Sequence, residues 1–105
     1  MANNMNNMMK QARRMQAQMQ KIQEELATLE VSASAGGGVV KVTATCDETI
    51  KDIHINPAAV DPEDMEMLED ALVVAINDAL GQAKETASQR MSALTGGLGL
   101  GGLGF

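Results

Sequence analysis

The feature that most constrains the fold is a run of apolar residues, spaced alternately three and four apart, through the first 29 residues. The run comprises Met5, Met8, Ala12, Met15, Met19, Ile22, Leu26 and Leu29. This a/d spacing, sustained over about three heptads, is typical of a helix that packs against another helix. The intervening residues are good helix formers, and no Gly or Pro occurs before Gly36. A helix of about 25 residues spans about 38 Å, so we expect part of it to project beyond a small domain and to require a partner.

The segment that follows alternates apolar and polar residues with the period of two that is typical of strands. It predicts a weak strand over residues 31–35, a turn at Gly36-Gly37-Gly38, a second strand over residues 40–46 and a third over residues 50–55. Connections this short indicate an antiparallel meander. The edges of such a sheet are exposed unless another element or another chain covers them.

A second helix is predicted after Asn56-Pro57 ends the sheet. Asp61 is the expected N-cap and Pro62 the expected first helical residue, followed by acids that suit the helix dipole. Its apolar face is expected to comprise Met65, Leu68, Leu72, Ile76, Leu80, Ala83, Ala87 and Met91, with Gly81 as a candidate bend. The order α-β-β-β-α predicts a single α+β domain over residues 1–95 and a flexible Gly/Leu-rich tail over residues 96–105.

The composition suggests that the domain works as a homodimer. There is no Trp or Tyr, and Phe105 is the only aromatic residue. The core must therefore be built from aliphatic residues and Met, which bury less area than aromatic rings. A core this thin is easier to stabilise when a second copy completes it.

Charge is unevenly distributed along a chain whose net charge is −6. The bases before residue 24 are Lys10, Arg13, Arg14 and Lys21, with no acid among them, whereas residues 61–78 contain acids and no base. With Met5 at an a position, all four bases lie at b, c or f, away from the apolar seam. An exposed basic stripe can follow a phosphate backbone, although a solubilising helix surface gives the same pattern.

The manner of nucleic-acid binding is constrained by what the sequence lacks. Without Tyr, Trp or an internal Phe, base stacking on single strands is not expected. No recognition-helix or zinc-finger pattern occurs either, so binding would depend on the phosphates and shape of a duplex.

Catalytic and metal sites find little support. Cys46 and His54 are single residues in predicted strands, and nothing beyond their presence suggests a nucleophile and base pair. The acids of the second helix are explained as cap and solvated residues, and the heptad placement of the methionines indicates packing rather than copper binding. We expect no enzyme activity, no metal, no cofactor and no small-molecule substrate.

Location follows from similar arguments. One cysteine cannot form an internal disulfide, so nothing requires an oxidising compartment. The N-terminus lacks the apolar run of a signal peptide, and no stretch is long enough to cross a bilayer. The expected location is the cytoplasm, without membrane attachment.

Several consecutive segments resemble a known family. They are MKQARRMQAQMQKIQEELATLEV, AGGGVVKVTATC, IKDIHINPAAVDPEDMEMLEDALVVAINDAL and MSALTGG, and together they cover nearly the whole chain. The sequence thus resembles the YbaB/EbfC family of bacterial nucleoid-associated proteins. The turn at residues 47–49 lacks the Gly often found there, and the tail is longer than the usual ending.

The resemblance implies a homodimer whose sheets associate and whose long helices project like tweezers. It also implies binding of double-stranded DNA with little sequence preference, a place in the nucleoid, and a role in nucleoid organisation or gene expression. Its DNA-binding residues would be Lys10, Arg13, Arg14 and Lys21 on the first helix, with Lys84 and Arg90 on the last. The alternative hypothesis is a helical scaffold or adaptor that binds another protein, which accounts for the acid excess equally well.

Overall fold

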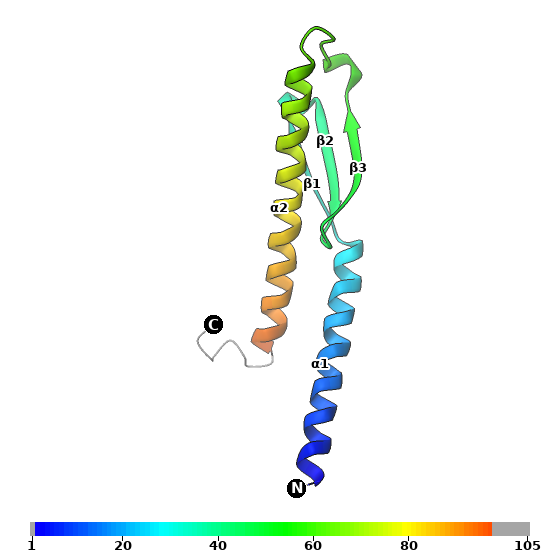
Figure 1. The fold of residues 1–105 in the computed structure, drawn as a ribbon, viewed down its shortest axis with the longest axis vertical. Helices are drawn as coiled ribbons and strands as arrows, with labels where there is room; N and C mark the ends of the chain where they lie inside the picture. Colours follow the sequence, from blue (N-terminus) through cyan, green and yellow to red (C-terminus); the bar gives the residue numbers. More distant parts are fainter. Residues whose placement is uncertain (1, 98–105) are drawn as a thin grey trace.

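The computed structural model describes the backbone of residues 2–97 and the side chains of residues 4–94. Its elements in order are α1 (Ala2–Thr28), β1 (Glu30–Ala35), η1 (Gly36–Gly38), β2 (Val40–Thr45), β3 (Thr49–Ile55), η2 (Pro57–Ala59) and α2 (Met65–Gly97). The predicted α-β-β-β-α order is therefore confirmed. The molecule is elongated, 74 × 26 × 15 Å, because α1 projects from one end of the sheet while α2 runs back along it (Figure 1).

The sheet is an antiparallel meander with strand order β1-β2-β3. Val42 on the central strand lies opposite Ala33 of β1 and Ile53 of β3, so these side chains share one face. The helix α2 covers this face, mainly over β1 and β2 (Figure 1). No helix among the described residues covers the opposite face, and its exposed residues include Ser32, Lys41 and His54. The two faces account for the period-two pattern of the sequence.

The core is formed by valines of β2 against a stripe of alanines on α2. The alanines Ala71, Ala75, Ala79 and Ala83 are at most 5% exposed. Side chains this small let the helix axis approach the sheet closely, and the larger Leu68 and Leu72 pack at the side of the contact, partly buried. Of the predicted apolar face of this helix, Ala83 is buried in the core, whereas Met65 at its start is 46% exposed. The sequence argument favoured large apolar residues, whereas the close approach of α2 selects small ones.

The second helix begins later than predicted, at Met65 rather than Pro62. The Asp61 carboxylate accepts a hydrogen bond from the Glu63 N–H at 2.9 Å, and the Asp64 N–H donates to the Asp61 carbonyl at 3.0 Å. These bonds close a turn before the helix. Asp64 then caps α2 by accepting from the Met67 N–H at 3.3 Å.

The helix continues through Gly81 and ends at Gly97. The first two residues of the predicted tail, Gly96 and Gly97, are therefore helical. The rest of the predicted tail, residues 98–105, lies outside the described residues.

The turn between β1 and β2 requires glycine at Gly36. Its φ is +66°, and a Cβ there would lie 2.4 Å from Val39 Cγ1 and 3.1 Å from Ala71 Cβ. The turn therefore packs directly against α2, which explains why the chain places glycine where β1 ends.

Candidate nucleic-acid interface

The N-terminal part of α1 extends past the end of α2. The two helices run in opposite directions, and Arg90 Nη1 lies 4.0 Å from Glu25 Oε2 (Figure 1). From Arg90 to Gly97, α2 advances about another 10 Å at the α-helical rise. It therefore ends at about the level of residue 18, and residues 2–17 of α1 project beyond it.

The four bases predicted on the first helix all lie on α1, and their side chains are exposed. They are Lys10, Arg13, Arg14 and Lys21. The first acid of α1 is Glu24, so the projecting part carries only positive side-chain charge. Among the described residues, the two ion pairs that form, Lys51–Glu30 and Arg90–Glu25, leave these four side chains without an acidic partner. An unpaired cation keeps its full charge for a phosphate group.

Two other bases are already engaged within the chain. Lys51 is the extra residue of a bulge in β3, and it reaches across the open face of the sheet to Glu30 on β1. The hydrogen bond and the charge of Glu30 raise the pKa of Lys51 above its ordinary value. Arg90 meets Glu25, although both side chains are about half exposed. Solvent weakens this pair, so a phosphate can compete for Arg90.

The predicted site residues lie in different parts of the structure: on the projecting part of α1, near the contact between α1 and α2, and further along α2. Lys10, Arg13 and Arg14 lie on the projecting part of α1, and Lys21 lies one turn from the ion pair between Glu25 and Arg90. Lys84 lies on α2 almost two turns before Arg90 and is exposed. Sequence reasoning did not identify Glu25 as the partner of Arg90. The two residues are distant in sequence, and only the packing of α1 against α2 brings them together.

A cluster of six acids lies at the other end of the molecule. The start of α2 and the turn before it carry Asp61, Glu63, Asp64, Glu66, Glu69 and Asp70. This segment lies beside the sheet at the end opposite the projecting α1 (Figure 1). The projecting end of α1 therefore carries positive side-chain charge despite the net charge of −6.

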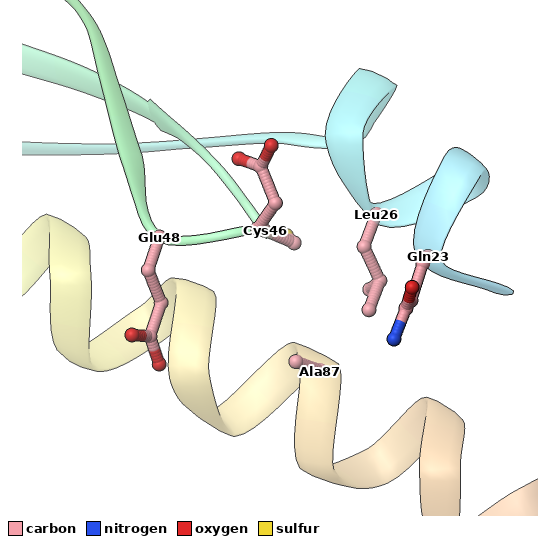
Figure 2. A pocket seen from close by; sticks show the side chains of 6 residues that line it. Gln23, Leu26, Cys46, Glu48 and Ala87 are labelled. Carbon is pink, nitrogen blue, oxygen red and sulfur yellow. The ribbon is translucent and has the colours of Figure 1, made fainter. Parts of the chain in front are cut away.

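A shallow pocket of about 460 Å³ lies where α1, the β2–β3 turn and α2 meet. It is lined by Gln23, Leu26, Cys46, Asp47, Glu48 and Ala87. Leu26 and Gln23 point from α1 toward Ala87 on α2, and Glu48 points toward α2 from the turn (Figure 2). The Cys46 thiol is buried and free. His54 pairs with Lys41, five residues before Cys46, so about 17 Å of strand separates the thiol from the imidazole.

That distance excludes a direct hydrogen bond between Cys46 and His54. Within the described residues, His, Cys, Asp and Glu side chains form no group of three or more that could hold a metal ion. Neither α1 nor α2, the two long helices described, contains an apolar stretch suited to crossing a membrane.

Comparison with known proteins agrees with this arrangement. The pattern of the YbaB/EbfC DNA-binding family matches residues 1–98. A nucleoid-associated protein from Moorella thermoacetica is 54% identical over 99 residues, covering 94% of this chain and 95% of the relative. Another from Desulforamulus reducens is 53% identical over 103 residues, covering 98% of each.

The fold also matches a solved structure. The crystal structure of an uncharacterized protein from Helicobacter pylori superposes with a TM-score of 0.75 at 20% identity, covering 83% of this chain and 91% of that one. Fold, basic helix and relatives together define a class of non-enzymatic, architectural DNA-binding proteins of bacteria. Within this class, the chain belongs to the YbaB/EbfC DNA-binding family.

Proposed function

We propose that this protein is a homodimer of the bacterial nucleoid that binds double-stranded DNA through the phosphate backbone. The observation that carries the proposal is the projecting part of α1, whose exposed bases have no acidic partner among the described residues. Such a surface provides affinity without reading bases, because phosphates carry no sequence information. The names of the relatives support the nucleoid as the site of action and the cytoplasm as the compartment.

The uncovered edge of the sheet supports the homodimer. Ile53 and Ile55 pair with Val42 and Val40, so they lie on the apolar face of the sheet. They remain 41% and 37% exposed, because α2 lies over the other two strands. An uncovered strand edge with exposed isoleucines promotes aggregation. In a two-fold symmetric dimer, the same edge of each copy would cover that of the other.

Two copies would bring two basic helices to one duplex, so that binding by one helix raises the effective concentration of the other. If roughly six phosphates are neutralised, the logarithm of affinity should fall with the logarithm of salt concentration at a slope near −5. A dimer carrying Ile53→Lys should dissociate in sedimentation velocity and bind duplex DNA at least about ten-fold more weakly. An Ile53→Lys protein that stays dimeric would remove this edge from the interface.

Charge reversal on α1 tests the DNA site. The Lys10→Glu, Arg13→Glu, Arg14→Glu protein should lose gel retardation of a duplex while remaining dimeric, because six favourable charges per dimer become repulsive. The matched control is Lys41→Glu on the open face of the sheet, compared with Lys10→Glu alone. Both change one exposed base, and only Lys10→Glu should weaken binding and reduce the salt dependence. Unchanged duplex binding by the triple variant would contradict the proposed DNA-binding site.

The outer side of α2 favours a second candidate, a scaffold or adaptor that binds another protein. Val73 and Val74 are 58% and 50% exposed, and Met67 is 43% exposed, beside Glu66 and Asp70. Apolar side chains among acids suit a basic partner segment. Purification with nuclease treatment separates the two candidates: for an adaptor, a protein should still co-elute in defined stoichiometry, and duplex binding should be absent.

A further inference from the structure

The projecting part of α1 carries an apolar surface as well as a basic one. Met5, Met8 and Met9 are 67%, 68% and 52% exposed, and the neighbouring Ala12 is exposed. We call these four residues the methionine patch. It lies beyond the end of α2, and no described residue of the chain covers it. Contiguous exposed methionines on a helix mark an interaction surface.

We propose that the methionine patch docks against the same patch of a second copy, so that the projecting helices of two dimers pair and the protein bridges two DNA duplexes. The bridging part of this proposal rests on the proposed DNA-binding function, whereas the helix pairing does not. Three observations indicate that the partner of the patch is the α1 helix of a second copy: the period of the apolar seam, the charge of the residues that flank it and the position of the bases.

The period of the seam indicates that the missing partner is a helix. The spacing of Met5, Met8 and Ala12 continues unbroken into Ile22 and Leu26, where the chain covers the seam itself. Leu26 is only 6% exposed because α2 and the sheet lie against it. One seam is thus covered at its C-terminal end and open at its N-terminal end. A constant a/d spacing fits the same kind of neighbour along its length.

The charge of the flanks favours a second copy as that helix. Positions e and g flank an a/d seam and meet the partner directly, and over residues 9–18 they hold Met9, Gln11, Gln16 and Gln18, none of which is charged. A helix with four bases would repel its own copy if the bases lay at these positions. Uncharged flanks remove that repulsion, and they also lack the charges that select a different partner.

Pairing through the patch would direct the bases outward. Lys10, Arg13 and Arg14 lie at f, b and c, on the side of α1 opposite the seam. Two paired helices would therefore present basic faces in opposite directions, on surfaces roughly 20 Å apart. One helix pair could then hold two duplexes. Because the patch is small, the pairing should be weak in free solution and stronger when DNA concentrates the dimers.

Cross-linking tests the pairing with a matched pair of variants. Ala12→Cys places a thiol in the seam, and Ala17→Cys places one at an f position, also exposed and also replacing alanine. Under mild oxidation with duplex DNA present, Ala12→Cys should give at least about five-fold more disulfide-linked dimer than Ala17→Cys. The parent chain sets the background, since its own thiol at Cys46 is buried.

Equal cross-linking of the two variants would overturn the pairing. A second result would also overturn the pairing: cross-linking of Ala12→Cys only in a chain truncated after Gly97. That result would mean that the removed C-terminal segment, and not a second copy, covers the methionine patch in the full chain. Adding Ile53→Lys to Ala12→Cys distinguishes the two interfaces. Cross-linking that disappears with the sheet-mediated dimer would place the contact inside that dimer and overturn pairing between dimers.

Bridging is tested by capture of a labelled duplex on an immobilised duplex. The Met5→Gln, Met8→Gln protein should capture at least about five-fold less labelled duplex, with affinity for one duplex unchanged within about two-fold. The control Asn6→Gln, Asn7→Gln changes b and c positions of the same turns and should capture normally. Full capture by the methionine variant would overturn bridging and leave the proposed function standing. Loss of single-duplex binding in that variant would assign the patch to DNA contact instead, whereas a parent chain that binds no duplex contradicts the proposed function itself.

Discussion

The sheet-bound half of α2 and the projecting half of α1 are both regular helices, yet they use apolar residues in opposite ways. Ala75 and Ala79, among the smallest side chains, are fully buried, while Met5 and Met8 are about two-thirds exposed. What differs is the surface opposite each helix. A packed sheet faces α2, and the described part of the chain places nothing opposite the start of α1 (Figure 1). An apolar pattern therefore predicts which residues pack against another surface. Whether that surface belongs to the same chain depends on the tertiary arrangement.

The same two regions differ in charge. The start of α2 carries acids and the projecting part of α1 carries bases, at opposite ends of a 74 Å molecule. One region thus supplies the core and the other supplies the surface proposed to bind DNA. Changes in the first should affect the free energy of unfolding, and changes in the second should affect association.

The largest effect on folding is expected from enlarging a buried alanine. Ala75→Leu should destabilise the protein by about 1 to 3 kcal/mol, because Ala75 is fully buried between α2 and the sheet and no space exists for the added carbons. The same substitution at exposed Ala17 on the projecting helix should change stability by less than about 0.5 kcal/mol. Urea unfolding followed by circular dichroism measures both.

The proposed difference between the two helices is contradicted if Ala75→Leu and Ala17→Leu change the free energy of unfolding by similar amounts. A loss of stability in Ala17→Leu similar to that in Ala75→Leu would mean that the projecting helix is packed in solution around residue 17. An Ala75→Leu protein of normal stability would mean that α2 does not approach the sheet as closely as its alanine stripe implies.

Sequence reasoning identified the two long helices and the three strands because each has its own period, whereas the short 3-10 helices η1 and η2 were not predicted as helices. Met5 to Leu29 repeat as a helix seam, and the residues of β2 alternate as a strand with one buried face. It missed what depends on the distance between elements. Ala71 and Ala75 form the core face only because α2 lies close to the sheet, and local composition carries no measure of that distance.

The sequence also predicted part of the candidate site, namely its exposed bases, but not the ion pair that one of them forms. The four bases of the first helix stood out because no acid separates them, and their exposure on α1 is confirmed, while their contact with DNA stays a prediction. The partner of Arg90 could not be predicted, since Glu25 reaches it only through the packing of α1 against α2. The start of α2 was placed too early because Asp61 and Asp64 carry the same capping signal, and both carboxylates accept backbone N–H groups.

A smaller effect is expected at the β2–β3 turn, where Glu48 has a φ of +65°. A side chain in this left-handed region costs about 1 kcal/mol, so Glu48→Gly should stabilise the protein by up to about 1 kcal/mol. Glu48→Ala is the control, because it removes the charge but keeps the Cβ, and it should not stabilise. DNA affinity should be unchanged in both, since the turn is remote from the projecting bases. If Glu48→Ala stabilises as much as Glu48→Gly, charge rather than backbone conformation governs this turn.

The smallest effect concerns a single carboxylate in the same turn. A hydrogen bond from the Thr45 hydroxyl lowers the pKa of Asp47 below its ordinary value of 3.8. A carboxyl group whose pKa is lower in the folded than in the unfolded protein adds stability above the unfolded value, and that contribution is lost as pH falls through the folded value. Thr45→Val, which keeps the β-branched shape but removes the hydroxyl, should move the pKa of Asp47 toward 3.8 and reduce the acid dependence of unfolding below that pH. Thr45→Ser keeps the hydroxyl and should keep the lowered pKa. Carboxyl chemical shifts of Asp47 during an acid titration measure the change, and identical titrations of Thr45→Val and the parent chain would assign the shift to the remaining groups of the turn.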